Sequence, residues 1–222
     1  MTLRKREYKM TTLLLIRHGQ SEANLSRVFA GNYNAPLTDL GLRQAEKTAE
    51  FIAENYKVDC VYASDLIRAF ETGKTIANSL NLPITPNNGL REIRAGEWEA
   101  LPFDDIVIKF PEEYKKWKED IGHSSCPNGE TVKELAERVM ATLTAIAEEN
   151  NGKTVAIATH ATPIRVSQTL IEHGNLEPMQ DIGWVSNASV TELIYDNGKW
   201  SVGKVGQDNH LSDFRTNLPS NV

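Results

Sequence analysis

The sequence contains little cysteine, with Cys60 and Cys126 the only two among 222 residues. Two isolated cysteines form neither the paired spacing of a metal site nor the dense framework of a small disulfide-bonded domain. A chain of this length can also bury a sizeable apolar core without covalent cross-links. We therefore expect both thiols to be reduced and structural.

Long apolar runs are absent as well. No stretch approaches the roughly 18 apolar residues of a membrane span, and the basic opening MTLRKREYKM is not followed by the apolar region of a signal peptide. We expect a cytoplasmic protein without a membrane partner. Residues 1–11 are expected to form an N-terminal extension and residues 12–222 a single domain.

Basic residues are fewer than acidic ones: the chain has 24 Lys and Arg and 30 Asp and Glu, which gives a net charge of -6. This sign disfavours nucleic acid and anionic membranes as partners through long-range repulsion. An anionic ligand would need a locally basic pocket, for which arginines are the natural candidates. The sequence leaves the oligomeric state open.

What the chain does contain is an alternation of apolar strands and amphipathic helices. The continuous apolar runs at residues 12–16 and 154–159 are typical of strands buried on both faces of a parallel sheet. A strand is also expected at residues 58–64, and a hairpin is expected in ASVTELIYDNGKWSVGKV because of its DNG turn. Helical spacing predicts four helices, over residues 38–52, 66–80, 131–150 and 162–173.

Polar residues at the starts of these helices suggest their caps. Thr38 or Asp39 is expected to cap the first helix, and Ser64 or Asp65 the second. The third begins with the TxxE pattern of a capping box, formed by Thr131 with a glutamate three residues later.

The stretch from Asn87 to Asn128 departs from this pattern, since it contains three prolines and no clean period. It predicts an irregular inserted segment over the sheet. The remaining elements predict an α/β fold, a single domain with a mostly parallel central sheet and helices on both faces. Ligands bind such sheets beyond the carboxyl ends of the strands, where His18 and His160 both fall.

Phosphate chemistry is one use for the side chains at these strand ends. Arg17 and Arg68 offer planar forks that bind phosphate oxygens in a bidentate manner, and Ser21 and Asn24 can add hydrogen bonds. His18 is the candidate nucleophile, because a neutral imidazole has one free nitrogen.

Two further groups complete this hypothesis. His160 would stabilise charge on the transferring phosphoryl group, and Glu92 or Glu97 would protonate the leaving alkoxide. On spacing alone, both histidines also fit an ordinary structural or surface role.

Five strings in a fixed order narrow these alternatives: LIRHGQSEAN, ASDLIRAFET, LREIRAGEWE, PNGET and ATHATPIR. Together they resemble the histidine phosphatase superfamily, the cofactor-dependent phosphoglycerate mutase-like proteins. The resemblance extends from Thr12 to about Leu211. It implies a phosphoglycerate mutase-like fold, no metal or other cofactor, and a small phosphorylated metabolite as substrate.

The resemblance also implies roles. His18 becomes phosphorylated, Arg17 and Arg68 hold the phosphate, His160 is the second histidine of the pocket, and Glu92 donates a proton and later activates water.

Three more positions belong to the expected substrate site. Ser21 and Asn24 match the RHGxSxxN pattern, and Ala161 follows the second histidine. Ala161 and Ala100 stand where the family usually has glycine. An alanine does not readily adopt a positive φ, so we expect at most a small shift beside Ala161.

Three functions fit these observations. The first is a metal-independent phosphatase that hydrolyses small phosphate monoesters through a phosphohistidine, which LREIRAGEWE favours because it resembles the phosphatase branch more than the mutase branch. The second is a phosphoglycerate mutase. The third, a non-catalytic binding module, is least favoured because all five pocket residues are present. The sequence does not name the substrate.

Overall fold

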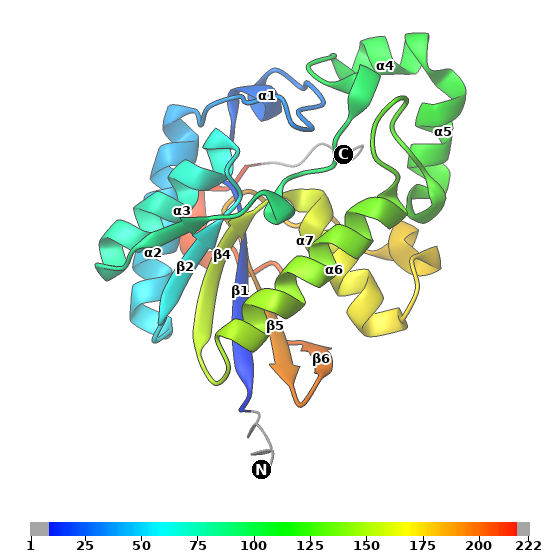
Figure 1. Ribbon diagram of the computed structural model, residues 1–222. Helices are drawn as coiled ribbons and strands as arrows, with labels where there is room; N and C mark the ends of the chain where they lie inside the picture. The colour runs from blue at the N-terminus through cyan, green and yellow to red at the C-terminus, as the bar shows by residue number, and fades with distance from the viewer. Residues whose placement is uncertain (1–8, 217–222) are drawn as a thin grey trace.

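A computed structural model describes residues 9–216, and across this range six strands form one sheet in the order β3-β2-β4-β1-β5-β6 (Figure 1). The first four strands in this order run parallel, whereas β5 is antiparallel to β1 and β6 to β5. The mostly parallel sheet is therefore confirmed. The strands are β1 Thr11–Arg17, β2 Cys60–Ala63, β3 Ile84–Pro86, β4 Thr154–Thr159, β5 Val190–Asp196 and β6 Lys199–Val202.

Helices cover both faces of this sheet, as expected. One core joins the sheet to α2 and α3, and a second joins its other face to α6 and α7. Leu14 and Ile16 of β1 point into the first core and Leu13 and Leu15 into the second, which explains the continuous apolar run. The helices are α1 Glu22–Leu25, α2 Asp39–Asn55, α3 Ile67–Leu80, α4 Phe103–Lys109, α5 Pro111–Glu119, α6 Val132–Glu149 and α7 Ala161–His173.

The helix starts follow the local sequence at two of the three predicted caps. Thr38 caps α2 and accepts a hydrogen bond from the backbone of Gly41, and Thr131 forms the predicted capping box on α6. The cap predicted for α3 is wrong. Its N-cap is Leu66, whose side chain makes no capping hydrogen bond, and Ser64 accepts a hydrogen bond from the backbone N–H of Leu66 at 3.3 Å.

The segment from Asn87 to Asn128 is more regular than predicted, because it contains α4 and α5 as well as short 3-10 turns. Pro102 is the N-cap of α4 and Pro111 is the first residue of α5. A proline at a helix start sacrifices no intrahelical hydrogen bond, so these prolines begin helices instead of interrupting them.

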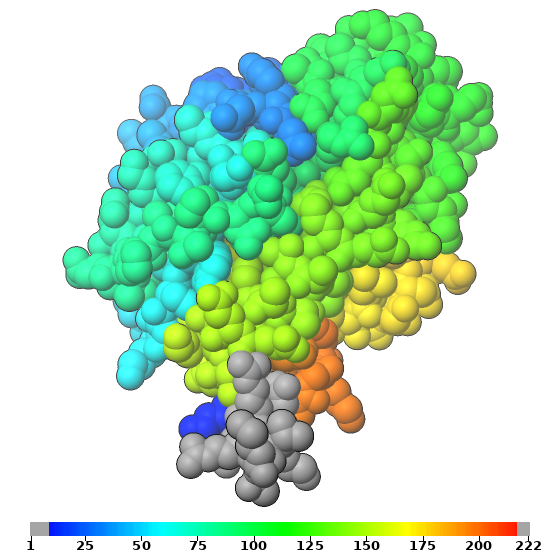
Figure 2. Space-filling view, in the orientation of Figure 1, coloured from blue at the N-terminus to red at the C-terminus, as the bar shows by residue number. Residues whose placement is uncertain are grey.

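This segment packs against the chain that follows β1. Phe29 donates its N–H to Leu101 and accepts one from Ala100, and Val28 bridges to Pro102. In Figure 2 the two stretches, green and blue, adjoin at the top of the molecule, above the carboxyl ends of β1 and β4.

Among the described residues, no helix combines the length and the apolar character of a membrane span. β1 begins at Thr11, next to the predicted domain start. Most of the predicted N-terminal extension, residues 1–8, lies outside the described residues.

Candidate active site

Two buried histidines meet at the carboxyl edge of the sheet. His18 directly follows β1 and His160 directly follows β4, and the register of these neighbouring strands pairs Arg17 with Thr159. The two imidazole centroids lie 5.1 Å apart in an edge-to-face arrangement. The predicted juxtaposition of the two histidines is therefore present.

Hydrogen bonds fix the tautomer of His18. Its Nδ1 lies 2.7 Å from the carbonyl oxygen of Gly19, which only accepts, so Nδ1 carries the proton. Nε2 is then unprotonated, and its lone pair accepts a hydrogen bond from Nε of Arg68 at 3.2 Å. Burial first, and then the charges of Arg68 and Arg17, hold the pKa of His18 well below its usual range. His18 is thus a neutral imidazole with its unprotonated nitrogen toward a cation.

A close backbone contact holds this loop in place. A Cβ on Gly19 would lie 2.3 Å from the carbonyl oxygen of Gly41, so no other residue fits after His18 without moving α2.

Backbone carbonyls hold the two arginines beside His18. Arg68 donates to the oxygens of Tyr33 at 2.8 Å and Gly31 at 2.7 Å, and Arg17 donates to Val185 at 2.6 Å. Burial lowers the pKa of each arginine to about 10, so both remain cationic at neutral pH. The buried Nε of Arg17 has no hydrogen-bond partner among residues 9–216. The pair can supply positive charge and donors to an oxyanion.

His160 is held by Ser64, a contact that the sequence analysis missed. Its Nε2 lies 2.8 Å from the Ser64 hydroxyl, and both side chains are fully buried. Its Nδ1 has no partner within the described part of the chain. Burial and then the Arg68 charge hold the pKa of His160 well below its usual range.

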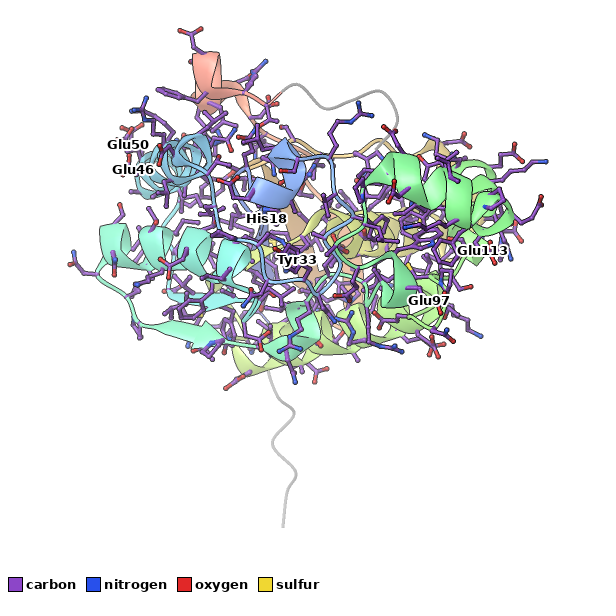
Figure 3. All side chains as sticks on the ribbon, turned by 90° about the horizontal axis from the view of Figure 1, so that it is seen from above. His18, Tyr33, Glu46, Glu50, Glu97 and Glu113 are labelled. Atoms are coloured by element: carbon purple, nitrogen blue, oxygen red, sulfur yellow. The ribbon has the colours of Figure 1, made fainter. Side chains whose placement is uncertain are left out.

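Glu92, and not Glu97, lies at the cavity beside His18. Its carboxylate accepts hydrogen bonds from the backbone N–H of Ile93 at 2.8 Å and of Thr162, in the first turn of α7, at 3.3 Å. Glu97 is exposed on the inserted segment, away from His18, and bonds Asn128 at 2.8 Å (Figure 3). Of the two glutamates considered, Glu92 is therefore the one whose carboxyl group can reach a ligand in the cavity.

The sequence predicted both Ser21 and Asn24 as substrate donors, but the structure places the two side chains differently. Asn24 lines the cavity. Ser21 is fully buried, does not line the cavity, and caps α1 while donating its hydroxyl proton to Oδ1 of Asn24 at 3.1 Å. Ser21 therefore lies outside the cavity lining, in contrast to the expectation. The Ser21 hydroxyl makes its hydrogen bonds within the capping box, where they orient the side chain of Asn24.

The loop before β5 also lines the site, and the sequence analysis did not single it out. Asn187 donates to the carbonyl oxygen of His18 at 3.1 Å and to Oδ1 of Asn24 at 3.2 Å, and Trp184 lines the same cavity. A signal was available, because an antiparallel strand starts where its parallel neighbours end. Residues just before β5 must therefore lie at the same edge as His18.

The two alanines that replace family glycines behave differently. Ala161 lines the cavity as the first residue of α7, with ordinary helical backbone, so no shift is needed there. Ala100 adopts φ 61°, in the left-handed region that favours glycine. The strained replacement is therefore Ala100, where the inserted segment pairs with Phe29.

The cavity has a volume of about 290 Å³ and opens beside His18, Arg17, Arg68 and Glu92. In the described range no group of three or more His, Cys, Asp or Glu side chains has a metal-binding arrangement. The side chains present offer a nucleophilic nitrogen, cationic donors and a carboxyl group around one space. This combination suits transfer of a phosphoryl group.

Comparison with known proteins agrees with this chemistry. Residues 13–208 match the histidine phosphatase superfamily (branch 1). The chain is 30% identical over 205 residues to the uncharacterized phosphatase PhoE of Bacillus subtilis, covering 92% of this chain and 99% of the relative. It is 29% identical over 204 residues to phosphoglycerate mutase-like protein 4 of Arabidopsis thaliana, covering 90% and 87%.

A solved structure extends the likeness to three dimensions. YhfR of Bacillus stearothermophilus superimposes with a TM-score of 0.86 at 26% identity, covering 90% of this chain and 99% of that one. The phosphoglycerate mutase-like architecture predicted from the sequence is thereby confirmed. The chain belongs to the histidine phosphatase superfamily (branch 1) and is a phosphomonoesterase of that family.

Proposed function

We propose that the protein hydrolyses small phosphate monoesters without a metal ion, through a covalent phosphohistidine at His18. The observation that carries the proposal is the arrangement of this imidazole. The carbonyl oxygen of Gly19 fixes the proton on Nδ1, so Nε2 is unprotonated and accepts a hydrogen bond from Nε of Arg68. A buried imidazole in this state is a nucleophile at neutral pH.

In the first step, Nε2 of His18 attacks the phosphorus and the bond from phosphorus to the ester oxygen breaks. The electron pair stays on the leaving oxygen, which takes a proton from the carboxyl group of Glu92. Arg17 and Arg68 neutralise the oxygens of the transferring group. His160 donates a hydrogen bond to the transferring group through Nδ1, the ring nitrogen that has no partner among residues 9–216.

In the second step, water attacks the phosphorus and gives a proton to Glu92. The bond from nitrogen to phosphorus breaks, its electron pair returns to Nε2, and inorganic phosphate leaves. Glu92 is protonated again at the end, so the cycle closes without another reagent. Glu92 and His18 line the same cavity, which supports this assignment.

We also propose which residues form the catalytic domain, where the enzyme acts and which partners it has. Residues 12–222 form the catalytic domain, which acts in the cytoplasm on small phosphorylated metabolites, with neither nucleic acid nor membrane as a partner. The net charge of -6 supports the exclusion of anionic polymers.

Trapping the intermediate tests the mechanism. Brief exposure to a labelled phosphate ester should leave acid-labile, alkali-stable label on His18, and full activity should persist in a chelator. His18→Ala should abolish both label and turnover, whereas His173→Ala, at an exposed position, should change neither. Label on a hydroxyl or thiol side chain, or loss of activity in the chelator, would contradict the proposal.

The alternative is a phosphoglycerate mutase, to which the mutase-like relative in Arabidopsis gives some support. A mutase must grip the carboxylate of its phosphoglycerate while excluding water. Beyond Arg17 and Arg68, the described cavity lining offers one further cation, Arg27, which is exposed. With so few cations available to bind a substrate carboxylate, the cavity favours hydrolysis over phosphoryl transfer to a phosphoglycerate.

The ratio of transfer to hydrolysis decides between the two. Phosphorylated enzyme is mixed with 3-phosphoglycerate, and both products are measured. We expect phosphate release to dominate. Transfer in tenfold excess, about 1.4 kcal/mol in barrier difference, would establish the mutase.

A further inference from the structure

We propose that this site selects phosphate monoesters of bulky apolar alcohols over those whose leaving group bears a carboxylate. The inference rests on the proposed hydrolysis and names its substrate class. It is drawn from five aromatic side chains that line the cavity. We call this set the aromatic wall: Phe29, Phe103, Tyr114, Trp117 and Trp184.

The aromatic wall is packed in advance of any ligand. The ring of Phe29 lies 5.4 Å from that of Trp117 and 5.7 Å from that of Phe103. Trp98 is fully buried and contacts both Phe29, at 5.4 Å, and Trp117, at 5.7 Å. A preformed apolar surface binds an apolar group without a large ordering cost.

Trp184 stands on a different element and is held by a cation. The guanidinium of Arg165 lies 4.3 Å from the centre of its ring, and Arg165 also donates to the carbonyl oxygen of Met179 at 2.6 Å. Arg165 is buried and does not line the cavity, so its guanidinium makes a cation–π contact with the Trp184 indole and does not reach a ligand in the cavity. Trp184 is thereby presented to the cavity in a fixed position.

The charges of the lining do not favour a carboxylate next to this wall. Arg17 and Arg68 lie at His18, where the phosphate binds, and Glu92 is the acid. Arg27 is the one lining cation that remains in the described chain, and it is exposed to solvent screening.

Within the aromatic wall, Tyr114 carries a neutral polar group. The Tyr114 hydroxyl has no hydrogen bond among the described residues, and burial raises its pKa, so it stays a donor. An uncharged, largely apolar alcohol therefore matches the space beside His18 better than an acid does.

Alkyl phosphates test this preference without altering the chemistry. Ethyl phosphate and hexyl phosphate have leaving alcohols of similar acidity and differ by four methylene groups, each worth up to about fourfold when fully buried. We expect kcat/KM to rise by at least about tenfold from ethyl to hexyl phosphate. We also expect hexyl phosphate to exceed both phosphoserine and 3-phosphoglycerate. Equal values for the two alkyl esters, or a preference for either carboxylate ester, would overturn the inference.

A matched pair of tryptophan variants assigns the preference to the aromatic wall. Trp184→Ala should reduce the hexyl to ethyl ratio by about tenfold. Trp200→Ala removes a half-buried tryptophan of β6 that packs on Tyr195 outside the cavity, so it should leave the ratio unchanged. An unchanged ratio of hexyl to ethyl phosphate hydrolysis in Trp184→Ala would show that the aromatic wall does not cause the preference.

Binding separates this inference from the proposed function. Calorimetry with the His18→Ala variant measures affinity for the same two alkyl phosphates without turnover. Tighter binding of hexyl phosphate supports the substrate class even if no ester is hydrolysed by the wild type. Hydrolysis of both esters without any difference in rate or affinity keeps the phosphatase and overturns the apolar selectivity.

Discussion

The Nε of Arg68 lies 3.2 Å from Nε2 of His18, with both side chains in the interior. A guanidinium in this position donates a hydrogen bond to the imidazole lone pair and repels any proton that would occupy it. Together with burial, this contact keeps His18 neutral, and in the proposed mechanism it places a cation beside the incoming phosphate.

The burial of His18 beside Arg68 predicts a pH dependence of stability. The pKa of His18 is lowered in the folded protein, so below its ordinary pKa near 6.5 the unfolded chain binds a proton that the folded chain does not. The free energy of unfolding should be unaffected by His18 above that pH. Below it, His18 should contribute a loss of up to about 1.4 kcal/mol per pH unit, until the folded protein also becomes protonated.

Urea denaturation between pH 7 and pH 5 measures this dependence. His160 has a lowered pKa for the same first cause, burial, and should add to the slope. His18→Asn should reduce the slope of the unfolding free energy against pH by the contribution of one proton, about 1.4 kcal/mol per pH unit. An identical slope in this variant would show that His18 is protonated in the folded protein.

Replacing Glu92 by Gln should separate leaving groups. Alkyl phosphates need a proton at departure and aryl phosphates with acidic phenols do not, so the alkyl rates should fall by about 10² to 10⁴-fold more. Glu97→Gln is the matched control in the same segment, because Glu97 is exposed and bonds Asn128. Equal losses on both ester classes in Glu92→Gln would assign the proton to water.

Ser64→Ala should lower kcat/KM by about tenfold through His160. The variant removes the hydroxyl that lies 2.8 Å from Nε2 of His160, and one hydrogen bond to a buried group is worth about 1–2 kcal/mol. Ser167→Ala is the control, since this buried serine bonds the backbone of its own helix, α7. Steady-state kinetics with one ester checks both variants, and equal activity would show that Ser64 does not orient His160.

Ala100→Gly should stabilise the protein by about 0.5–1 kcal/mol. Alanine at φ 61° bears a steric cost that glycine avoids, and Ala100 is exposed, so little packing is lost. Ala141→Gly, at an exposed position inside α6, should instead destabilise by a similar amount. Urea denaturation of the two variants should give shifts of opposite sign, and a loss of stability in Ala100→Gly would contradict this reading.

Much of the fold was determined locally by the sequence. The apolar run of β1 predicted burial on both faces because successive side chains of a strand alternate, and Leu13 and Leu14 do enter opposite cores. The capping box of Thr131 involves residues three apart, within reach of local reasoning. The meeting of His18 and His160 followed from parallel strand ends sharing one edge.

The surroundings of that edge were decided only by tertiary structure. Ser64 and His160 are 96 residues apart, and His18 and Asn187 are 169 apart, so neither contact has a local signature. Ser64 was predicted to be a helix cap because its partner His160, which follows β4, is distant in the sequence. Strand direction predicts only that the residues before β5 lie at the same edge as His18; the individual contacts depend on sheet register and side-chain packing, which hydrophobic periodicity does not encode. The same reason kept the aromatic wall hidden, since its side chains come from separate segments that only packing brings to one cavity.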